Sequence, residues 1–351
     1  MKSILFKLNL NGRGVVNFDS NDQKYFTNKH CGTNYKEENL KLAKKAFKKK
    51  ANAETTYDEY GNEKTTDVEY VLKISRDCLR HAIFSDDYDA INPGIFYNDL
   101  SAAYFISSIP GLVRRYMFTT PKGQAYTAKS PLFVTSALET TGAVPYLEVC
   151  SVSTKKEKGI NSLYYTEEVG DVKYEVKGGI DLKQMQFVSD DDYLGRVGFK
   201  SEWLEGETPL LDIVFKQHYG YVPYKVGCFT STKNTFVKSI AEHGIRFDND
   251  FIVLLVRETL KRLLGVFIKR AGAYAATSSL EIKFVEDGIR DIFDSEDGWI
   301  KITADNVDKI DFEVDDFYEE ADADAVAKQR EEQAEKIKQL KEARKNQNDE
   351  Q

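Results

Sequence analysis

The sequence predicts an α+β fold, because strand patterns and helix patterns follow one another without the regular spacing of alternating strand and helix units. In residues 4–10, large apolar side chains recur at every second position, as in a strand with one buried face. Residues 250–274 carry apolar side chains at helical spacing, which predicts one long helix with a broad apolar face. Residues 280–285 alternate again and are expected to form another strand.

The first half of the chain contains two further candidate helices. Residues 68–74 have the pattern of a strand, and Ser75 after it is expected to cap the N-terminus of a short helix. Residues 99–116 are expected to be helical. Pro110 should kink or restart this helix, because proline lacks the N–H group that an inner helical turn requires.

Two other stretches are less regular. Residues 38–66 are polar and rich in lysine, and their pattern allows either a helix or a mobile hairpin around residues 60–62. Residues 120–247 are rich in Gly, Thr, Tyr and Val, which predicts irregular β structure. Within this stretch, Gly178 and Gly179 are expected to form a turn that leads into a strand.

Length and composition limit the class of protein. A chain of 351 residues with 41% apolar composition can bury a large core, in one large or two smaller domains. A mean hydropathy of -0.49 and the lack of an apolar run near twenty residues argue against a membrane span or membrane partner. Lys7 interrupts any signal core, so we expect a cytoplasmic protein. The cysteines lack zinc-site or disulfide spacing and are expected to be free thiols: Cys31, Cys78, Cys150 and Cys228.

The formal net charge of -8 is unevenly distributed along the chain. Residues 286–324 contain 16 Asp and Glu against three Lys and Arg, whereas residues 1–285 contain 35 acidic against 39 basic residues. We therefore divide the chain into a mildly basic body (1–285), an acidic segment (286–318) and a charged, exposed helical tail (319–351). The tail has few large apolar residues and is expected to be dispensable for folding.

The motifs of common enzymes are missing. There is no HExxH helix, no phosphate-binding Walker loop and no GxSxG nucleophile turn, and Gly12-Arg13-Gly14 is only a lone GxG. Acidic pairs at 286–287, 296–297 and 315–316 have ligand types for a divalent cation, but a solvated surface is their ordinary explanation. We therefore expect a protein that is not an enzyme, without metal or other cofactor.

Basic residues beside apolar segments are the most informative feature. Arg80 and His81 lie in the expected short helix, and Arg114 and Arg115 follow the apolar helix of residues 99–116. Planar guanidinium groups suit phosphate oxygens, although an exposed helix face or a helix end would explain the same residues. Lys269 and Arg270 fall near the end of the expected long helix, where basic residues are favoured in any case. The aromatic residues that could stack bases among these charges are Phe18, Tyr25, Tyr35, Tyr104, Tyr116, Tyr126 and Tyr274.

Six segments, in matching order over about residues 1–285, resemble the backbone subunit of type I-F-variant CRISPR surveillance complexes (Cascade), in the repeat-associated RNA-binding (RAMP) superfamily. The segments are Gly12-Arg-Gly-Val-Val-Asn-Phe18, Cys78-Leu-Arg-His-Ala-Ile-Phe84, Ser108-Ile-Pro-Gly-Leu-Val-Arg-Arg-Tyr116, Lys129-Ser-Pro-Leu132, Leu182-Lys-Gln-Met-Gln-Phe-Val-Ser189, and Glu258-Thr-Leu-Lys-Arg-Leu263 with Lys269-Arg-Ala-Gly-Ala-Tyr274.

The resemblance implies a modified RRM-like (ferredoxin-like) core with inserted β-rich and mobile segments. It also implies that several copies of the chain polymerise along one CRISPR RNA, contact other Cascade subunits and present the guide for pairing with target DNA. The sequence departs from an ordinary RRM because it has no RNP signature, and nothing in the resemblance corresponds to the acidic segment or the tail.

Binding of RNA without sequence preference requires phosphate contacts, so we select eight basic residues of these segments as candidate RNA-binding residues and expect the tail to be dispensable for this binding. They are Arg13, Arg80, His81, Arg114, Arg115, Lys129, Lys269 and Arg270. Gly12, Gly14 and Gly111 are expected to permit close backbone approach to the RNA.

Two alternatives remain open from the sequence. The first is a non-catalytic scaffolding protein whose basic patches contact other proteins. The second is a metal-dependent nuclease that uses acidic pairs such as Glu296 and Asp297.

Overall fold

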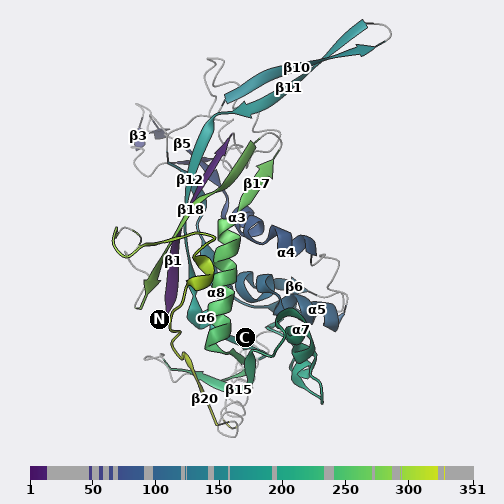
Figure 1. The fold of residues 1–351 in the computed structure, drawn as a ribbon, viewed down its shortest axis with the longest axis vertical. Coiled ribbons are helices and arrows are strands. Elements are labelled where there is room, and N and C mark those ends of the chain that lie inside the picture. Colours follow the sequence, from purple (N-terminus) through teal and green to yellow (C-terminus); the bar gives the residue numbers. More distant parts are fainter. Residues whose placement is uncertain are drawn as a thin grey trace, which may run out of the picture.

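The computed structural model confirms the α+β class: antiparallel sheets carry helices on their sides (Figure 1). No helix in the described part of the chain is long and apolar enough to cross a membrane. The structure describes residues 1–13, 47–49, 55–57, 63–65, 70–90, 98–119, 123, 125–140, 146–156, 159–191, 196–232, 241–270, 273–286, 293, 295–322 and 328.

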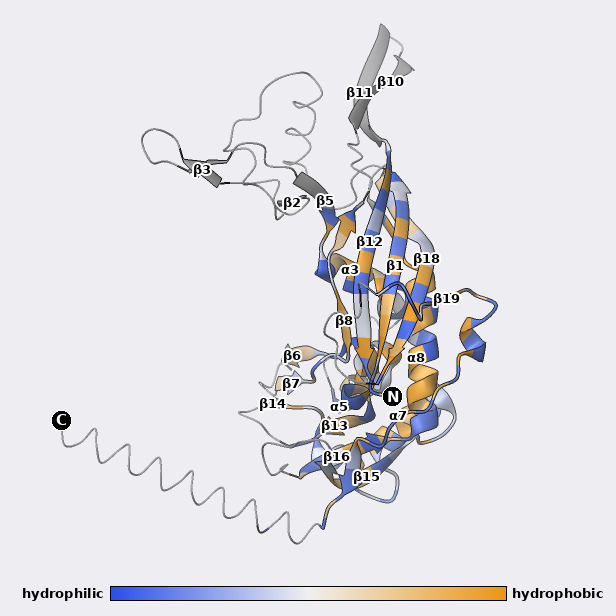
Figure 2. Cartoon of the chain, turned by 90° about the vertical axis from the view of Figure 1, so that its left-hand side faces the viewer, coloured by the Kyte–Doolittle hydropathy of each residue, from blue (hydrophilic) through white to orange (hydrophobic). Residues whose placement is uncertain are grey.

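The centre of the molecule is an antiparallel sheet built on three long strands, β1 (Ser3–Arg13), β12 (Asp171–Asp181) and β18 (Ala273–Val285). β1 lies in the middle, with β12 on one side and β18 on the other. The predicted strand at residues 4–10 is therefore confirmed. Apolar and polar residues alternate along all three strands, as the orange and blue bands in Figure 2 show.

Shorter strands extend this sheet on both sides. The order is β17-β18-β1-β12-β9-β5-β2, with β19 also paired to β18 and β8 also paired to β12. The bounds of these strands are β17 (Phe267–Arg270), β19 (Ile300–Ile302), β8 (Leu132–Val134), β9 (Ala137–Glu139), β5 (Tyr70–Ile74) and β2 (Phe47–Lys49).

Helices cover the apolar face of the sheet. The buried side chains of β1, such as Phe6 and Leu8, belong to one core with Leu79 of α3 and Leu255 and Leu260 of α8. The helices are α3 (Arg76–Ile83), α4 (Ser85–Ala90), α5 (Asp99–Ser107), α6 (Leu182–Gln186), α7 (Leu210–Tyr219) and α8 (Asn249–Leu264), with a π-helical turn at Pro110–Arg114 and 3-10 turns at Ser201–Leu204 and Val307–Lys309.

Smaller β units complete the described fold. Their strands are β13 (Phe187–Ser189), β16 (Glu242–Phe247), β15 (Tyr224–Ser231) and β20 (Tyr318–Glu320) in one sheet, and β14 (Arg196–Val197), β7 (Ala125–Thr127) and β6 (Met117–Thr119) in another. Two hairpins are β10 (Tyr146–Lys156) with β11 (Gly159–Val169), and β3 (Thr55–Tyr57) with β4 (Glu63–Thr65). The last hairpin brackets residues 60–62, where a hairpin was one of the two expected structures.

The long helix was predicted correctly at its start but not at its end. α8 stops at Leu264, where the N–H of Gly265 donates hydrogen bonds to the carbonyls of Lys261 (3.0 Å) and Arg262 (3.2 Å). The apolar residues that follow belong to strand β17, which pairs with β18. Single-sequence periodicity missed this change because a short apolar run fits either a helix or a strand.

The middle of the chain also differs from its prediction. It contains helix α7, and the two glycines expected in a turn lie inside strand β12. A Cβ atom on Gly178 would lie 2.2 Å from the ring of Phe6, and one on Gly179 would lie 2.4 Å from the ring of Phe133. These glycines therefore make room for aromatic rings that pack on the sheet.

The described part of the acidic segment packs on the body. Its apolar side chains Val307, Ile310, Val314 and Phe317 are buried, and β19 pairs with β18. Strand β20 then pairs with β15 and crosses the expected boundary between residues 318 and 319. The tail after Asp322 lies outside the described residues, apart from Lys328.

Candidate nucleic-acid interface

Helix α3 presents the first predicted basic residues beside the core. The Ser75 hydroxyl accepts a hydrogen bond from the Cys78 N–H (3.3 Å), which confirms Ser75 as the N-cap. Because Leu79 faces the core, Arg80 after it lies at the edge of the helix and donates from Nη2 to the Arg114 carbonyl (2.9 Å). His81 is exposed on the same helix. Arg80 thus joins two segments that are far apart in the sequence.

The chain reaches Arg114 and Arg115 through a tightly packed turn. After α5, the Ser108 hydroxyl donates to the Phe105 carbonyl (2.6 Å) and accepts from the Gly111 N–H (3.3 Å). A Cβ atom on Gly111 would lie 2.1 Å from the Phe105 carbonyl oxygen, so only glycine fits. The predicted restart at Pro110 is confirmed as a π-helical turn.

The close approach at Gly111 is therefore an internal contact and not an approach to a ligand. Gly12 shows the same: a Cβ there would lie 2.2 Å from the Tyr274 carbonyl oxygen of the neighbouring strand. Gly14 lies outside the described residues.

Arg115 is the most unusual side chain of the interface. It is 5% exposed, and its backbone φ of 61° is the left-handed conformation that non-glycine residues rarely adopt. Its Nη2 donates to the Gln184 carbonyl (3.0 Å), but its buried Nε has no hydrogen-bond partner among the described residues. Burial lowers the pKa of this guanidinium to about 10, which still leaves it charged at neutral pH.

Arg80, Arg114 and Arg115 meet at one pocket of about 420 Å³. Lys129 is exposed between two further lining residues, Ala128 and Ser130. The complete lining is Arg80, Phe105, Arg114, Arg115, Tyr116, Met117, Phe118, Ala128 and Ser130. We call this site the arginine pocket. Four of the eight predicted residues thus line or flank a single site.

The arginine pocket also contains residues that the sequence analysis did not select. Met117 is 78% exposed at its rim, and Phe118 stacks on the buried Tyr126 with ring centroids 5.1 Å apart. Tyr116, one of the expected stacking aromatics, is instead buried, and its hydroxyl donates to the Gly198 carbonyl (2.5 Å). In the sequence, the position of Met117 directly after Arg114-Arg115-Tyr116 could have indicated that it belongs to this site.

Other predicted residues lie in a row across the central sheet. Arg13 at the end of β1 and Lys269 of β17 are both register partners of Tyr274, which lies between them on β18. Both basic residues are exposed, and Tyr274 is 42% exposed and stacks on Phe267. The row therefore places an aromatic ring between two cations. The side chain of Arg270 lies outside the described residues.

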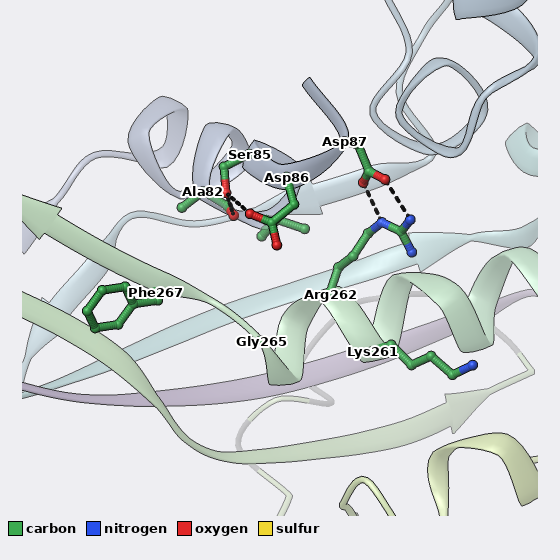
Figure 3. Close-up of a pocket in the computed structure, with 9 residues that line it drawn as sticks. Ala82, Ser85, Asp86, Asp87, Lys261, Arg262, Gly265 and Phe267 are labelled. Carbon is green, nitrogen blue, oxygen red and sulfur yellow. Dashed lines mark hydrogen bonds and ion pairs between the residues drawn. The ribbon is translucent and has the colours of Figure 1, made fainter. Parts of the chain in front are cut away.

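A second hollow, of about 490 Å³, is lined by an arginine whose surroundings differ from those of Arg115 (Figure 3). Arg262, on its wall, forms two hydrogen bonds to the Asp87 carboxylate (2.6 and 2.8 Å) and another to Glu258 (2.9 Å). Burial lowers the pKa of Arg262, but the hydrogen bonds to these carboxylates outweigh it and raise that pKa. The charge of this arginine is therefore already matched by the protein's own carboxylates.

The acidic pairs do not assemble a metal site in the described residues, which contain no group of three or more His, Cys, Asp or Glu able to hold a metal ion. Glu296 and Asp297 are exposed. Asp316 forms an ion pair with Arg246 (2.5 Å). Asp287 lies outside the described part of the chain.

Comparison with known proteins agrees with the six motifs. A family model described as "Type I-Fv CRISPR-associated protein Cas7fv-like" matches residues 1–306. No curated protein matches the chain. A solved "CRISPR RNA-guided surveillance complex" chain is 8% identical, with a TM-score of 0.36 and coverage of 97% of this chain and 85% of its own. A second, "CRISPR RNA-guided surveillance complex, pre-nicking", is 8% identical, with a TM-score of 0.29 and coverage of 81% and 79%. Because the family model spans most of the sequence, the chain belongs to the Cas7fv-like family of type I-Fv CRISPR-associated proteins, and the resemblance to a Cascade backbone subunit is confirmed.

Proposed function

We propose that this protein binds the CRISPR RNA through the phosphates that enter the arginine pocket, and that it performs no chemistry on the RNA. The main support is that Arg80, Arg114 and Arg115 line one site. The buried guanidinium of Arg115 is only partly hydrogen-bonded by the described residues. Burying a charge without a carboxylate partner costs folding free energy, so a ligand anion is the physical reason to keep it there.

The chemistry of the pocket fits backbone recognition of single-stranded RNA. Guanidinium groups bind phosphate oxygens with two parallel hydrogen bonds, and the exposed Met117 provides an apolar surface for a base or ribose. The row of Arg13, Tyr274 and Lys269 is a second candidate contact, because a ring between two cations suits an unpaired nucleotide. Recognition of this kind leaves the base edges available for pairing with target DNA.

We also infer an RRM-like core. In chain order, β1, α3, β8 with β9, β12, α8 and β18 give the succession strand-helix-strand-strand-helix-strand. In space, β18 and β12 flank β1, and β8 and β9 follow β12. This order supports the ferredoxin-like arrangement, in which the first and third strands are central.

Repeated copies on one guide would form a head-to-tail assembly whose length the RNA sets. Size-exclusion chromatography before and after ribonuclease treatment tests this: the purified protein should elute as a large RNA-containing species that the nuclease reduces. A monomer free of nucleic acid that also ignores added CRISPR RNA would contradict the proposal.

The residues are tested by filter binding of Arg→Ala variants at several salt concentrations. The Arg114→Ala/Arg115→Ala variant should bind every RNA sequence more weakly. Each arginine that binds a phosphate should, when replaced by Ala, lower the salt slope by roughly 0.7. Asp86→Ala, in the hollow of Figure 3, is the surface control and should bind like the wild type. Unchanged affinity of a folded double variant would assign this pair a purely structural role.

A further inference from the structure

The end of the acidic segment and the first two residues of the tail form a strap, residues 307–320, that runs along helix α8 to strand β15 (Figure 1). The strap lies just beyond the part of the chain that the family model matches, residues 1–306. Its carboxylates neutralise basic residues of the body: Asp308 pairs with Lys261 (2.7 Å) and Asp316 with Arg246 (2.5 Å). The strap is thus held by complementary charge as well as by its buried apolar side chains.

A single buried side chain, Gln186 of helix α6, fastens the end of the strap. Gln186 is 0% exposed. Its Nε2 donates to the Asp315 carbonyl (3.2 Å) and to Asn249 Oδ1 (2.7 Å), while its Oε1 accepts from the Phe317 N–H (3.0 Å). Asn249 in turn donates to the Val314 carbonyl (3.1 Å). Two of the three hydrogen bonds of Gln186 therefore go directly to the strap backbone.

The same short helix holds the buried arginine of the arginine pocket. Arg115 Nη2 donates to the carbonyl of Gln184, two residues before Gln186. The strap continues past Gln186 to Tyr318, whose ring lies 4.8 Å from that of Phe187, directly after the helix. Arg115 is close enough to lower the pKa of the Tyr318 hydroxyl, although burial outweighs it and raises that pKa to about 12. The strap, α6 and Arg115 thus form one connected layer.

We propose that the strap positions Arg115 for RNA through Gln186, which is a positioning residue of the arginine pocket. This inference rests on the proposed function. Helix α6 has only five residues, and a helix of that length does not hold its own geometry, so its place depends on the groups packed around it. The hydrogen bonds of Gln186 fix α6, and α6 presents the Gln184 carbonyl that fixes one end of the guanidinium.

The test compares Gln186→Met with Gln184→Met. Both changes replace Gln by Met in the same helix, but only the first removes a side chain that bonds the strap, since Arg115 uses the backbone carbonyl of Gln184. Filter binding should show that Gln186→Met weakens RNA binding by about tenfold, within the range of couplings in one hydrogen-bond network. Gln184→Met should bind like the wild type.

A double-mutant cycle separates positioning from general destabilisation. If Gln186 acts through Arg115, adding Gln186→Met to Arg115→Met should cause little further loss of affinity, whereas adding it to Lys129→Ala should cause the full loss. Full additivity with Arg115→Met, or wild-type binding by a folded Gln186→Met, would overturn the proposal. If Gln186→Met does not fold, Asp316→Ala loosens the strap from its exposed side and serves in its place.

A readout without RNA keeps this inference separate from the proposed function. In the spectrum of ¹⁵N-arginine protein, the Arg115 Nε–Hε resonance, assigned by its loss in Arg115→Met, should shift in Gln186→Met and stay in place in Gln184→Met. An unmoved resonance in both variants would also overturn the proposal. If the wild-type protein binds no RNA while this resonance shifts, the proposed function fails and the positioning of Arg115 by Gln186 stands.

Discussion

Arg115 and Arg262 are both largely buried arginines, but their surroundings are opposite. Arg262 is enclosed by the carboxylates of Asp87 and Glu258, whereas Arg115 receives a single backbone carbonyl among the described groups. Burial acts on both, yet the pKa of Arg262 is raised and that of Arg115 is lowered to about 10. A buried arginine therefore indicates a ligand site only when the protein has not supplied its counter-charge.

The largest expected effect is on stability, at the paired arginine. Arg262→Met should lower the free energy of unfolding by about 3 kcal/mol, because it leaves the half-buried Asp87 without its cation and Glu258 with Lys261 alone. Urea denaturation followed by circular dichroism measures this loss. RNA affinity of the folded protein should not change. Arg262→Lys keeps the charge but not the planar fork, so its free energy of unfolding should lie between those of the wild type and Arg262→Met. Equal stability of all three proteins would remove the distinction between the two arginines.

The reverse is expected at the arginine of the pocket. Arg115→Met should leave the free energy of unfolding unchanged or raise it by about 1 kcal/mol, because an apolar side chain of similar length no longer carries a desolvated charge. The same variant should reduce the salt slope of RNA binding by roughly 0.7. Denaturation and filter binding on one preparation measure both. A loss of stability as large as that of Arg262→Met would show that Arg115 is a structural residue.

A smaller effect concerns pH and again belongs to the paired arginine. Burial raises the pKa of Glu258, but hydrogen bonds from Lys261 and Arg262 outweigh it, so the pKa lies below its ordinary 4.5 in the folded protein. A carboxyl group of this kind stabilises the fold above pH 4.5, and its contribution disappears as the pH falls through the folded pKa. Glu258→Gln should therefore flatten the stability profile below about pH 4.5, by less than about 1 kcal/mol. An unchanged profile would mean that the pair contributes nothing measurable.

The smallest effects are expected at the end of the chain, where two truncations locate the end of the strap. A truncation after Asp322 should keep the melting temperature and the RNA affinity of the full chain. A truncation after Tyr318 removes most of β20 and the hydrogen bond from the Ala321 N–H to the Cys228 carbonyl (2.8 Å), and should melt about 2 °C lower. Thermal denaturation of the three proteins measures the difference. A large fall in the melting temperature of the protein truncated after Asp322 would show that the later residues dock on the body.

Local sequence patterns were sufficient where one segment determines its own structure. The alternation of β1, the Ser75 cap of α3 and the restart at Pro110 were all predicted, because each follows from periodicity or backbone chemistry within a few residues. The order of the six motifs was also sufficient to identify the family that the family model confirmed.

The same patterns failed where pairing with another strand, or packing against another side chain, decides the structure. Residues 267–270 form a strand because β18 offers its edge, and Gly178 lies within a strand because the ring of Phe6 fills the place of its side chain. Phe6 is remote from Gly178 in the sequence, so no local window contains that contact. The partner of residues 267–270 is the strand that follows them directly, but their short apolar run fits a helix as well as a strand.

By itself, the sequence determined the mixed fold class, the family and the set of arginines from which the candidate site is drawn. The candidate residues included Arg115 and not Arg262, but the local sequence supplied no physical reason to separate them, because both follow apolar segments and both lie beside another basic residue. Only the tertiary structure placed Asp87 against Arg262 and left the described surroundings of Arg115 without a carboxylate. The physical reason is that the state of a buried charge depends on the groups within a few ångströms in space, and folding brings those groups from remote parts of the chain.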